Sequence, residues 1–294
     1  MPDLRRSKPA VSRFVAMLVL AMFTAGAGPA QQACGSADTP CETAAGRYHI
    51  QVPDTAGPHP AMVFLHGYGG RGGSLLNGST AREALSRGYA FIAPDGLVRP
   101  GGRRTSWSFH PIFFRYRDEA AFLREVLQDA ADRFDIDPGR AVLAGFSIGG
   151  SMASYIACET PEDFFAYAPV SGSFWRPHPE SCAAPVRLLH THGWQDRVVP
   201  LEGRVIRQVE GRDFAQGDVF RAMQLWRRAN RCTGNRPDVT DTNDRFWRRK
   251  WTNCAPGSAL ELALFDGGHG IPRGWSQMVF DWLEELSSRT ALSQ

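Results

Sequence analysis

A serine between two glycines is the residue whose surroundings most directly indicate chemistry. Ser147 lies in Gly145-Phe146-Ser147-Ile148-Gly149, between the apolar run 141–145 and a stretch of small residues that begins at Ile148. A sharp strand-to-helix turn of this kind exposes the serine hydroxyl at a helix N-terminus, where backbone N–H groups favour developing negative charge. The two glycines leave room for strand and helix to pack closely. We therefore predict that Ser147 is a nucleophile.

A serine nucleophile needs a general base, and the base needs an orienting acid. His269 follows the apolar run 260–265 in a glycine-rich loop, and Asp196 follows the apolar run 186–192 in another loop. The chain order Ser147, Asp196, His269 is the order found in α/β-hydrolases. Intervals of 49 and 73 residues leave room for a strand and a crossover helix in each case. These positions predict a Ser147–Asp196–His269 triad.

Other histidines and one other acid fit these roles less well. His190 and His192 lie inside an apolar run, which favours a structural role, and His178 precedes the acid in a proline-rich loop. Asp266 lies three residues before His269 on the same loop and is the alternative acid.

Hydrolysis through a serine also needs N–H donors for the oxyanion. One donor is expected to be the backbone N–H of Ile148, directly after the nucleophile. The other is expected in the loop that follows the apolar run 61–65, where Tyr68 is assigned and Gly67 is the alternative. His66 in the same loop is interpreted as a bracing residue.

These residues must be positioned by buried strands that alternate with amphipathic helices. Apolar runs predict strands at 47–52, 61–65, 89–93, 141–145, 165–170, 186–192 and 260–265. Apolar residues at helical spacing predict helices at 79–88, 117–134, 148–158, 216–229 and 275–287. This alternation predicts an α/β fold with a mostly parallel central sheet and helices on both faces. No repeat or Pro/Ser-rich linker is visible, so residues 31–294 are expected to form a single domain.

Residues 1–30 have the three-part pattern of a signal peptide. Four positive residues precede the apolar segment 14–24, and small residues follow it. The apolar segment is shorter than the ~20 residues of a spanning helix. We therefore predict cleavage among residues 27–33, a secreted or periplasmic protein, and no membrane anchor after cleavage.

Charge and cysteine content bear on partners and compartment. The first 30 residues carry a net charge of +3, which equals that of the whole chain, so the mature chain is near neutral and nucleic acid is not an expected partner.

All six cysteines follow the signal, and an even number in an exported chain indicates disulfides. Their spacing alone does not select one set of pairs. No Cys-x-x-Cys or His-x-x-x-His pair is present, and no metal or cofactor is expected.

With these motifs in this order, the chain resembles the secreted polyhydroxybutyrate depolymerase and feruloyl esterase type of α/β-hydrolase over about residues 48–282. The resemblance is carried by Leu65-His66-Gly67, Ala93-Pro94-Asp95-Gly96, the motif around Ser147, Ala168-Pro169-Val170-Ser171-Gly172, His192-Gly193 with Asp196, and Gly267-Gly268-His269. It implies the same triad. It also implies the disulfides Cys158–Cys182 and Cys232–Cys254, which leaves Cys34 and Cys41 to pair locally.

Two features concern the substrate pocket. Ile148 stands where this family usually has a small residue or Asn, so its side chain is expected to narrow or dry the pocket. Trp107, Trp175 and Trp194 are candidates for lining an aromatic acyl or alcohol site. The chain ends soon after its last predicted helix, which favours small or oligomeric esters over insoluble polymer.

The resemblance implies an exported serine esterase that needs no cofactor. Its expected substrates are short hydroxyacyl oligomers, such as polyhydroxybutyrate fragments, or hydroxycinnamoyl esters. A serine peptidase on the same fold and a non-catalytic envelope binding protein are the alternatives. The sequence does not indicate an oligomeric state.

Overall fold

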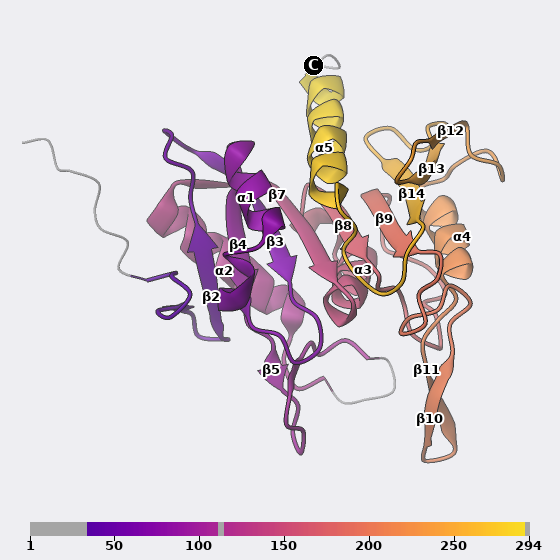
Figure 1. The fold of residues 1–294 in the computed structure, drawn as a ribbon, viewed down its shortest axis with the longest axis horizontal. Helices are drawn as coiled ribbons and strands as arrows, with labels where there is room; N and C mark the ends of the chain where they lie inside the picture. Colours follow the sequence, from indigo (N-terminus) through magenta and orange to yellow (C-terminus); the bar gives the residue numbers. More distant parts are fainter. Residues whose placement is uncertain (1–33, 111–114, 292–294) are drawn as a thin grey trace, which may run out of the picture. The chain divides into compact units, whose positions relative to one another are not determined.

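The seven predicted strands and three further ones form one ten-stranded sheet (Figure 1) in the computed structural model, which describes residues 34–110 and 115–291. From one edge to the other the strands are β1 (Cys41–Glu42), β2 (Arg47–Gln51), β4 (Ala90–Pro94), β3 (His59–Leu65), β7 (Ile136–Phe146), β8 (Ala166–Val170), β9 (Arg187–Gly193), β14 (Ala259–Phe265), β13 (Trp247–Trp251) and β12 (Val239–Thr242). The expected signal peptide, residues 1–30, lies outside the described residues, as do residues 31–33 of the expected mature domain.

The centre of the sheet is parallel. Strands β4, β3, β7, β8, β9 and β14 all run in one direction, and the strands outside them pair antiparallel. Because the carboxyl ends of parallel strands meet at one edge, the loops that follow β3, β7, β9 and β14 gather there. All the residues predicted to form the catalytic triad and the oxyanion hole lie in these loops or, for Ile148, at the start of the helix that follows β7.

Helices cover both faces of the sheet. The helices are α1 (Ser79–Ser86), α2 (Glu119–Phe134), α3 (Ile148–Glu159), α4 (Val219–Ala229) and α5 (Trp275–Ala291), with short 3-10 helices η1 (Gly72–Leu75) and η2 (Pro161–Asp163). Val63 and Leu65 of β3 belong to the core shared with α2, α3 and α4. Met62 and Phe64 belong to the core shared with α1 and α5. Burial of both faces explains why the parallel strands read as continuous apolar runs, and the predicted fold class is confirmed.

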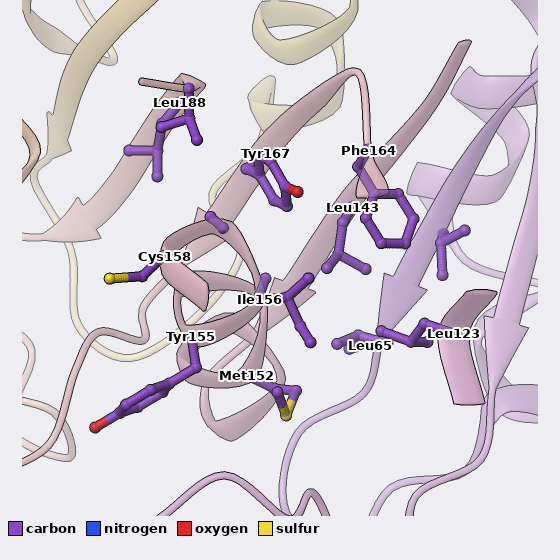
Figure 2. Packing of buried hydrophobic residues seen from close by; sticks show 14 of the residues in the cluster. Leu65, Leu123, Leu143, Met152, Tyr155, Ile156, Cys158, Phe164, Tyr167 and Leu188 are labelled. Atoms are coloured by element: carbon purple, nitrogen blue, oxygen red, sulfur yellow. The ribbon is translucent and has the colours of Figure 1, made fainter. Parts of the chain in front are cut away.

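Helix α3 packs closely on the strands beside it (Figure 2). Its Met152 and Ile156 side chains share one buried cluster with Leu65, Leu143 and Leu123, which come from β3, β7 and α2. Complete burial of such a side chain contributes about 1.5–3 kcal/mol. This packing fixes the N-terminus of α3 at the end of β7, where the predicted nucleophile lies.

Capping aspartates define where two helices begin. The Asp118 carboxylate accepts a hydrogen bond from the Ala121 N–H (3.0 Å) at the start of α2. The Asp218 carboxylate accepts one from the Arg221 N–H (2.9 Å) at the start of α4. A cap residue has a non-helical backbone, so α4 begins at Val219 rather than at the predicted residue 216.

Two hairpins that the sequence did not predict extend past the carboxyl ends of the parallel strands (Figure 1). One consists of β5 (Leu97–Val98) and β6 (Thr105–Ser106), the other of β10 (Val205–Val209) and β11 (Arg212–Ala215). Glu210 and Gly211 join the second pair with φ values of 51° and 73°, which suits a two-residue turn between twisted strands. Four of the five residues of β10 are exposed, and its three β-branched residues form neither the continuous apolar run nor the alternation by which strands are recognised.

Three disulfides connect the six cysteines in the pairs that the resemblance implies. Cys158–Cys182 links the end of α3 to the segment before β9, and Cys232–Cys254 links the segments after α4 and β13. Cys34–Cys41 closes a short loop at the start of the described chain. Within residues 34–110 and 115–291, no helix has both the length and the apolar character needed to cross a membrane.

Candidate active site

The predicted nucleophile occupies a strained turn. Ser147 lies between β7 and α3 with φ 58° and ψ −121°, a conformation that costs a non-glycine residue on the order of 1–3 kcal/mol. Its backbone N–H donates to the Val170 carbonyl (3.0 Å), and its carbonyl accepts from the Ser151 N–H (2.9 Å). These bonds hold the turn, so the strain is maintained by the surrounding sheet and helix.

The glycines on either side of this turn are required by close packing. A Cβ atom at Gly145 would lie 2.5 Å from the Gly149 carbonyl oxygen, and one at Gly149 would overlap the Leu65 carbonyl. Both contacts are with backbone, which cannot move aside without shifting β3 or α3. The spacing of Gly145, Ser147 and Gly149 therefore has the steric cause proposed from the sequence.

A hydrogen-bonded chain connects Ser147, His269 and Asp196. His269 Nε2 lies 2.9 Å from Ser147 Oγ, and His269 Nδ1 lies 2.8 Å from Asp196 Oδ2. The imidazole also contacts the Phe146 ring, with 4.9 Å between ring centroids. With Nδ1–H donating to the carboxylate, Nε2 carries a lone pair directed at the serine hydroxyl. This is the tautomer that a general base requires.

Asp196 is held by its own turn. Its Oδ1 accepts hydrogen bonds from the Val198 and Val199 N–H groups, both at 2.8 Å, which leaves Oδ2 to face His269. Burial raises the pKa of the Asp196 carboxyl, but the hydrogen bonds from His269 and Val199 outweigh it and place that pKa below its ordinary value. The carboxylate therefore stays ionised at neutral pH although its side chain has no exposed surface.

Asp266, the alternative acid, has a different partner. Its Oδ1 accepts a hydrogen bond of 2.6 Å from the Gln195 amide, and the residue is exposed. Asp266 therefore connects the turn that contains Asp196 (the acid turn) to the loop that contains His269 (the base loop) at the protein surface. Asp196, in contrast, contacts the imidazole of His269.

Backbone bonds also join the two loops. The Trp194 N–H donates to the Phe265 carbonyl and the Gln195 N–H to the Gly267 carbonyl, each at 2.9 Å. On the other side of the base loop, the Ser171 hydroxyl donates to the Gly270 carbonyl (3.0 Å). Acid and base are thus positioned as one unit at the ends of β9 and β14.

A pair of buried histidines lies behind the acid. His192 Nε2–H donates to the Val199 carbonyl (2.8 Å), which leaves its Nδ1 to accept from His190 Nε2–H (3.1 Å). Burial lowers the pKa of both imidazoles, most strongly that of His190. Both are therefore neutral, and they brace the Asp196 turn from within β9. This agrees with the structural role predicted for them.

The loop after β3 presents a candidate oxyanion donor. The Gly67 carbonyl accepts hydrogen bonds from His66 Nδ1–H (2.7 Å) and from the Gly70 N–H (2.9 Å). In a trans peptide the C=O and N–H point in opposite directions, so these bonds turn the Tyr68 N–H away from the loop interior. Among the hydrogen bonds of residues 34–110 and 115–291, neither the Tyr68 nor the Ile148 N–H is a donor.

His66 connects this loop to its surroundings. Its Nε2 accepts from the Gly96 N–H (2.9 Å), and its carbonyl accepts from the Trp107 indole N–H (2.9 Å). Burial lowers the pKa of His66, so the ring is neutral and can act as donor and acceptor at once. Its contacts are those of the bracing residue that the sequence indicated.

A cleft of about 520 Å³ opens beside the serine. Its lining includes Ser147, Ile148 and Tyr68 together with an aromatic wall formed by Trp107, Phe109, Trp175 and Phe214. A volume of this size is typical of small-molecule sites. Within the described residues, no cluster of three or more His, Cys, Asp or Glu side chains could hold a metal ion.

The three tryptophans named from the sequence separate into two groups. Trp107 and Trp175 are buried in the cleft lining. Trp194 is 55% exposed, does not line the cleft, and makes an edge-to-face contact with Trp247 at 6.2 Å between ring centroids.

The part of the lining that comes from the β10–β11 hairpin was not predicted from the sequence. Ile206, Arg207 and Phe214 enter the cleft from this hairpin. The Glu210-Gly211 pair is the one local signal that could have indicated the turn, because glycine readily adopts positive φ in hairpins.

Buried histidines lead to a prediction about acid stability. Burial lowers the pKa of His66, His110, His178, His190 and His192, that of His110 to about 4. The pKa of His49 is raised instead, because hydrogen bonds to Asp95 and to the Ser36 carbonyl outweigh the effect of burial. Below about pH 6.5 the five histidines with lowered pKa values therefore bind more protons in the unfolded chain than in the folded one, which lowers the free energy of unfolding. The raised pKa values of buried Glu119 and Glu261 act in the opposite direction, and the five histidines outnumber them.

We expect the free energy of unfolding to fall as pH decreases from 7 to 5.5. Each histidine that stays neutral when folded contributes up to about 1.4 kcal/mol per pH unit. Urea titrations followed by circular dichroism at several pH values measure this slope. A free energy of unfolding that stays constant or rises over that interval would contradict the prediction.

Comparison with known proteins agrees with this architecture. A family model described as the alpha/beta hydrolase family matches residues 62–284. Feruloyl esterase B of Piromyces equi is 28% identical over 238 residues, which are 78% of this chain and 42% of that protein. The probable feruloyl esterase C of Aspergillus flavus is 28% identical over 205 residues, or 65% of this chain and 71% of that protein.

The acetyl xylan esterase from Aspergillus awamori superposes with a TM-score of 0.59 at 15% identity, over 81% of this chain and 93% of that one. At this identity the likeness concerns the fold. The two sequence relatives confirm the feruloyl esterase side of the predicted resemblance and do not bear on its polyhydroxybutyrate depolymerase side. Because the family model covers most of the sequence, the chain belongs to the alpha/beta hydrolase family.

Proposed function

We propose that the protein is a serine esterase that hydrolyses carboxylic esters through an acyl-enzyme. One observation carries the proposal: the hydrogen-bonded chain of Ser147, His269 and Asp196 ends at an open cleft with an aromatic wall. Ser147 occupies a strained turn, and the joined loops hold His269 and Asp196 in line with it. Backbone strain of this kind costs about 1–3 kcal/mol and has no evident use in a protein that only binds. The geometry therefore favours catalysis over a non-catalytic envelope protein.

The proposed reaction has two stages. In the first, Ser147 Oγ attacks the ester carbonyl carbon while His269 Nε2 takes the hydroxyl proton, and Asp196 stabilises the resulting imidazolium. The Tyr68 and Ile148 N–H groups bind the oxyanion. His269 then protonates the departing alcohol, which leaves an acyl group on Ser147. In the second stage a water molecule follows the same course and releases the acid.

The cleft supports an aromatic substrate. Trp175 and Phe214 lie with their ring centroids 4.7 Å apart in its lining, and two of the sequence relatives are named feruloyl esterase B and probable feruloyl esterase C. Planar rings of this kind stack on hydroxycinnamoyl groups. Hydroxycinnamoyl esters are therefore the substrate class that we favour over short hydroxyacyl oligomers.

We further propose that Trp194 contacts substrate outside the cleft. Trp247 is the first residue of β13, and its register opposite Leu264 places it near the carboxyl end of β14, beside the base loop. Together the two exposed rings offer an aromatic surface to the part of an ester that remains outside.

Export is also part of the proposal. Three disulfides in the described chain suit an oxidising compartment. Such a compartment is consistent with the signal pattern of residues 1–30.

A panel of esters tests the proposed function. We expect hydrolysis of p-nitrophenyl acetate and butyrate, weaker hydrolysis of the decanoate, and hydrolysis of methyl ferulate, measured as kcat/KM. Trp175→Ala should lower kcat/KM for methyl ferulate about tenfold more than for the acetate, because only the aromatic acyl group stacks on that ring. Faster cleavage of peptide amides than of any ester would establish a peptidase instead.

The same panel tests Trp194. Trp194→Ala should reduce kcat/KM for a feruloylated oligosaccharide more than for methyl ferulate, whose alcohol is too small to leave the cleft. Equal losses on both esters would identify Trp194 as a structural residue.

A further inference from the structure

The charged side chains that line the cleft beside Ser147 are all cationic. Arg99, Arg104 and Arg207 belong to its lining, and none of the described residues that form this lining is Asp or Glu. Arg99 and Arg104 come from the loop between β5 and β6, and Arg207 comes from β10, so both hairpins at this end of the sheet contribute cations (Figure 1). The cleft thus combines an aromatic wall with positively charged residues.

Aromatic rings, rather than carboxylates, accompany Arg104 and Arg207. The Arg104 guanidinium carbon lies 5.9 Å from the Tyr68 ring centroid, and that of Arg207 lies 5.3 Å from the Phe214 ring centroid. Ion pairs hold several other arginines of the chain, such as Arg87 with Asp281, but within the described residues neither Arg104 nor Arg207 forms one. Their charges are therefore not neutralised by the protein.

Arginine in this setting is suited to a carboxylate. Its planar guanidinium donates two parallel hydrogen bonds to a carboxylate and stacks on aromatic faces at the same time. A cleft whose walls are apolar concentrates the field of charges of one sign. An anionic substrate would thus be attracted into the cleft. A neutral ester of equal size would form no ion pair with the same residues.

We propose that the enzyme prefers esters that bear a carboxylate, which Arg104 and Arg207 bind while Ser147 attacks the ester carbonyl. This inference rests on the proposed esterase function and adds the charge of the substrate to it. The carboxylate is carried by the acyl part or by the alcohol part of the ester. Two pairs of substrates separate these cases.

For the acyl side, the mono-p-nitrophenyl ester of adipic acid is compared with the same molecule methylated at its free carboxyl group. For the alcohol side, 4-acetoxybenzoate is compared with its methyl ester. After subtraction of spontaneous hydrolysis, kcat/KM at low ionic strength should favour the anionic member of at least one pair by about fivefold to twentyfold. Added NaCl should reduce this preference, because exposed charges are screened over about 8–10 Å.

Four variants test which residues cause the preference. Arg104→Gln and Arg207→Gln should each lower the ratio of anionic to neutral kcat/KM by about twofold to fivefold, the range for one exposed charge pair. Arg103→Gln and Arg212→Gln are matched controls, since both residues are exposed on the same hairpins and neither lines the cleft. The controls should leave the ratio unchanged. Use of a ratio removes any effect of Arg104 on the neighbouring Gly69 and the oxyanion loop.

The outcomes separate this inference from the proposed function. Hydrolysis of the neutral esters at rates equal to or above those of the anionic ones, in both pairs, would overturn the inference and leave the esterase intact. A preference that persists in the Arg104→Gln/Arg207→Gln double variant would also overturn it. Failure to hydrolyse any of the four esters would instead contradict the esterase function.

Discussion

Replacing Ser147 or His269 with alanine is expected to lower kcat about 10⁴-fold or more while the fold is retained. Without the Ser147 hydroxyl no acyl-enzyme forms, and without the His269 imidazole the hydroxyl keeps its proton. Neither side chain belongs to the two hydrophobic cores, so the folded state loses little. The measurements are kcat on p-nitrophenyl butyrate, labelling by a fluorophosphonate probe, and the thermal unfolding midpoint.

Ser154→Ala is the matched control for this prediction. Ser154 lies in the same helix as the nucleophile turn, and its hydroxyl donates only to the Gly150 carbonyl one turn earlier (3.0 Å). We expect this variant to retain kcat within about threefold and to be labelled normally. A Ser147→Ala enzyme that still hydrolysed esters or accepted the probe would assign the nucleophile to another residue.

The central fold was predictable because each parallel strand is buried on both faces. Strands such as β3 and β14 read as short apolar runs, and their glycine-rich ends mark where the chain leaves the sheet. The exposed hairpins obey no such rule. β10 has three β-branched residues, which favour a strand, but four of its five residues are exposed and it has neither a continuous apolar run nor a strict alternation.

The candidate triad was predictable for a geometric reason. Parallel strands bring their carboxyl ends to one edge, so Ser147, Asp196 and His269 could be expected to meet although 122 residues separate the first from the last. The direction of a side chain on a loop follows no comparable rule. Trp194 lies two residues before Asp196, yet its ring is exposed beside Trp247 rather than in the cleft.

The cleft lining was the least predictable part of the site. Arg104 and Arg207 are about 100 residues apart and reach the same cavity only because two separate hairpins extend past the same sheet edge. Their juxtaposition depends on the tertiary arrangement and not on any local pattern. The sequence alone therefore does not indicate the charge of the substrate.

Asp196→Asn is expected to lower kcat by about 10⁴-fold, the loss seen when a serine protease triad loses its carboxylate. In the variant, the amide oxygen can still accept from the Val198 and Val199 N–H groups, which leaves the amide N–H₂ facing His269 Nδ1. That nitrogen must then accept, so the proton moves to Nε2, and Nε2–H can no longer take the Ser147 proton. The fold should be kept, because the amide replaces the carboxylate without a change of shape.

Asp266→Asn provides the contrast that decides between the two acids. The amide that replaces Asp266 keeps an oxygen for the Gln195 N–H, and this exposed bond lies outside the triad, so kcat should stay within about threefold of wild type. Both variants are compared on p-nitrophenyl butyrate, with thermal unfolding to verify folding. A severe loss in Asp266→Asn together with a mild one in Asp196→Asn would reverse the assignment. Because only Asp196 contacts the imidazole, at 2.8 Å, the large loss is expected at Asp196 alone.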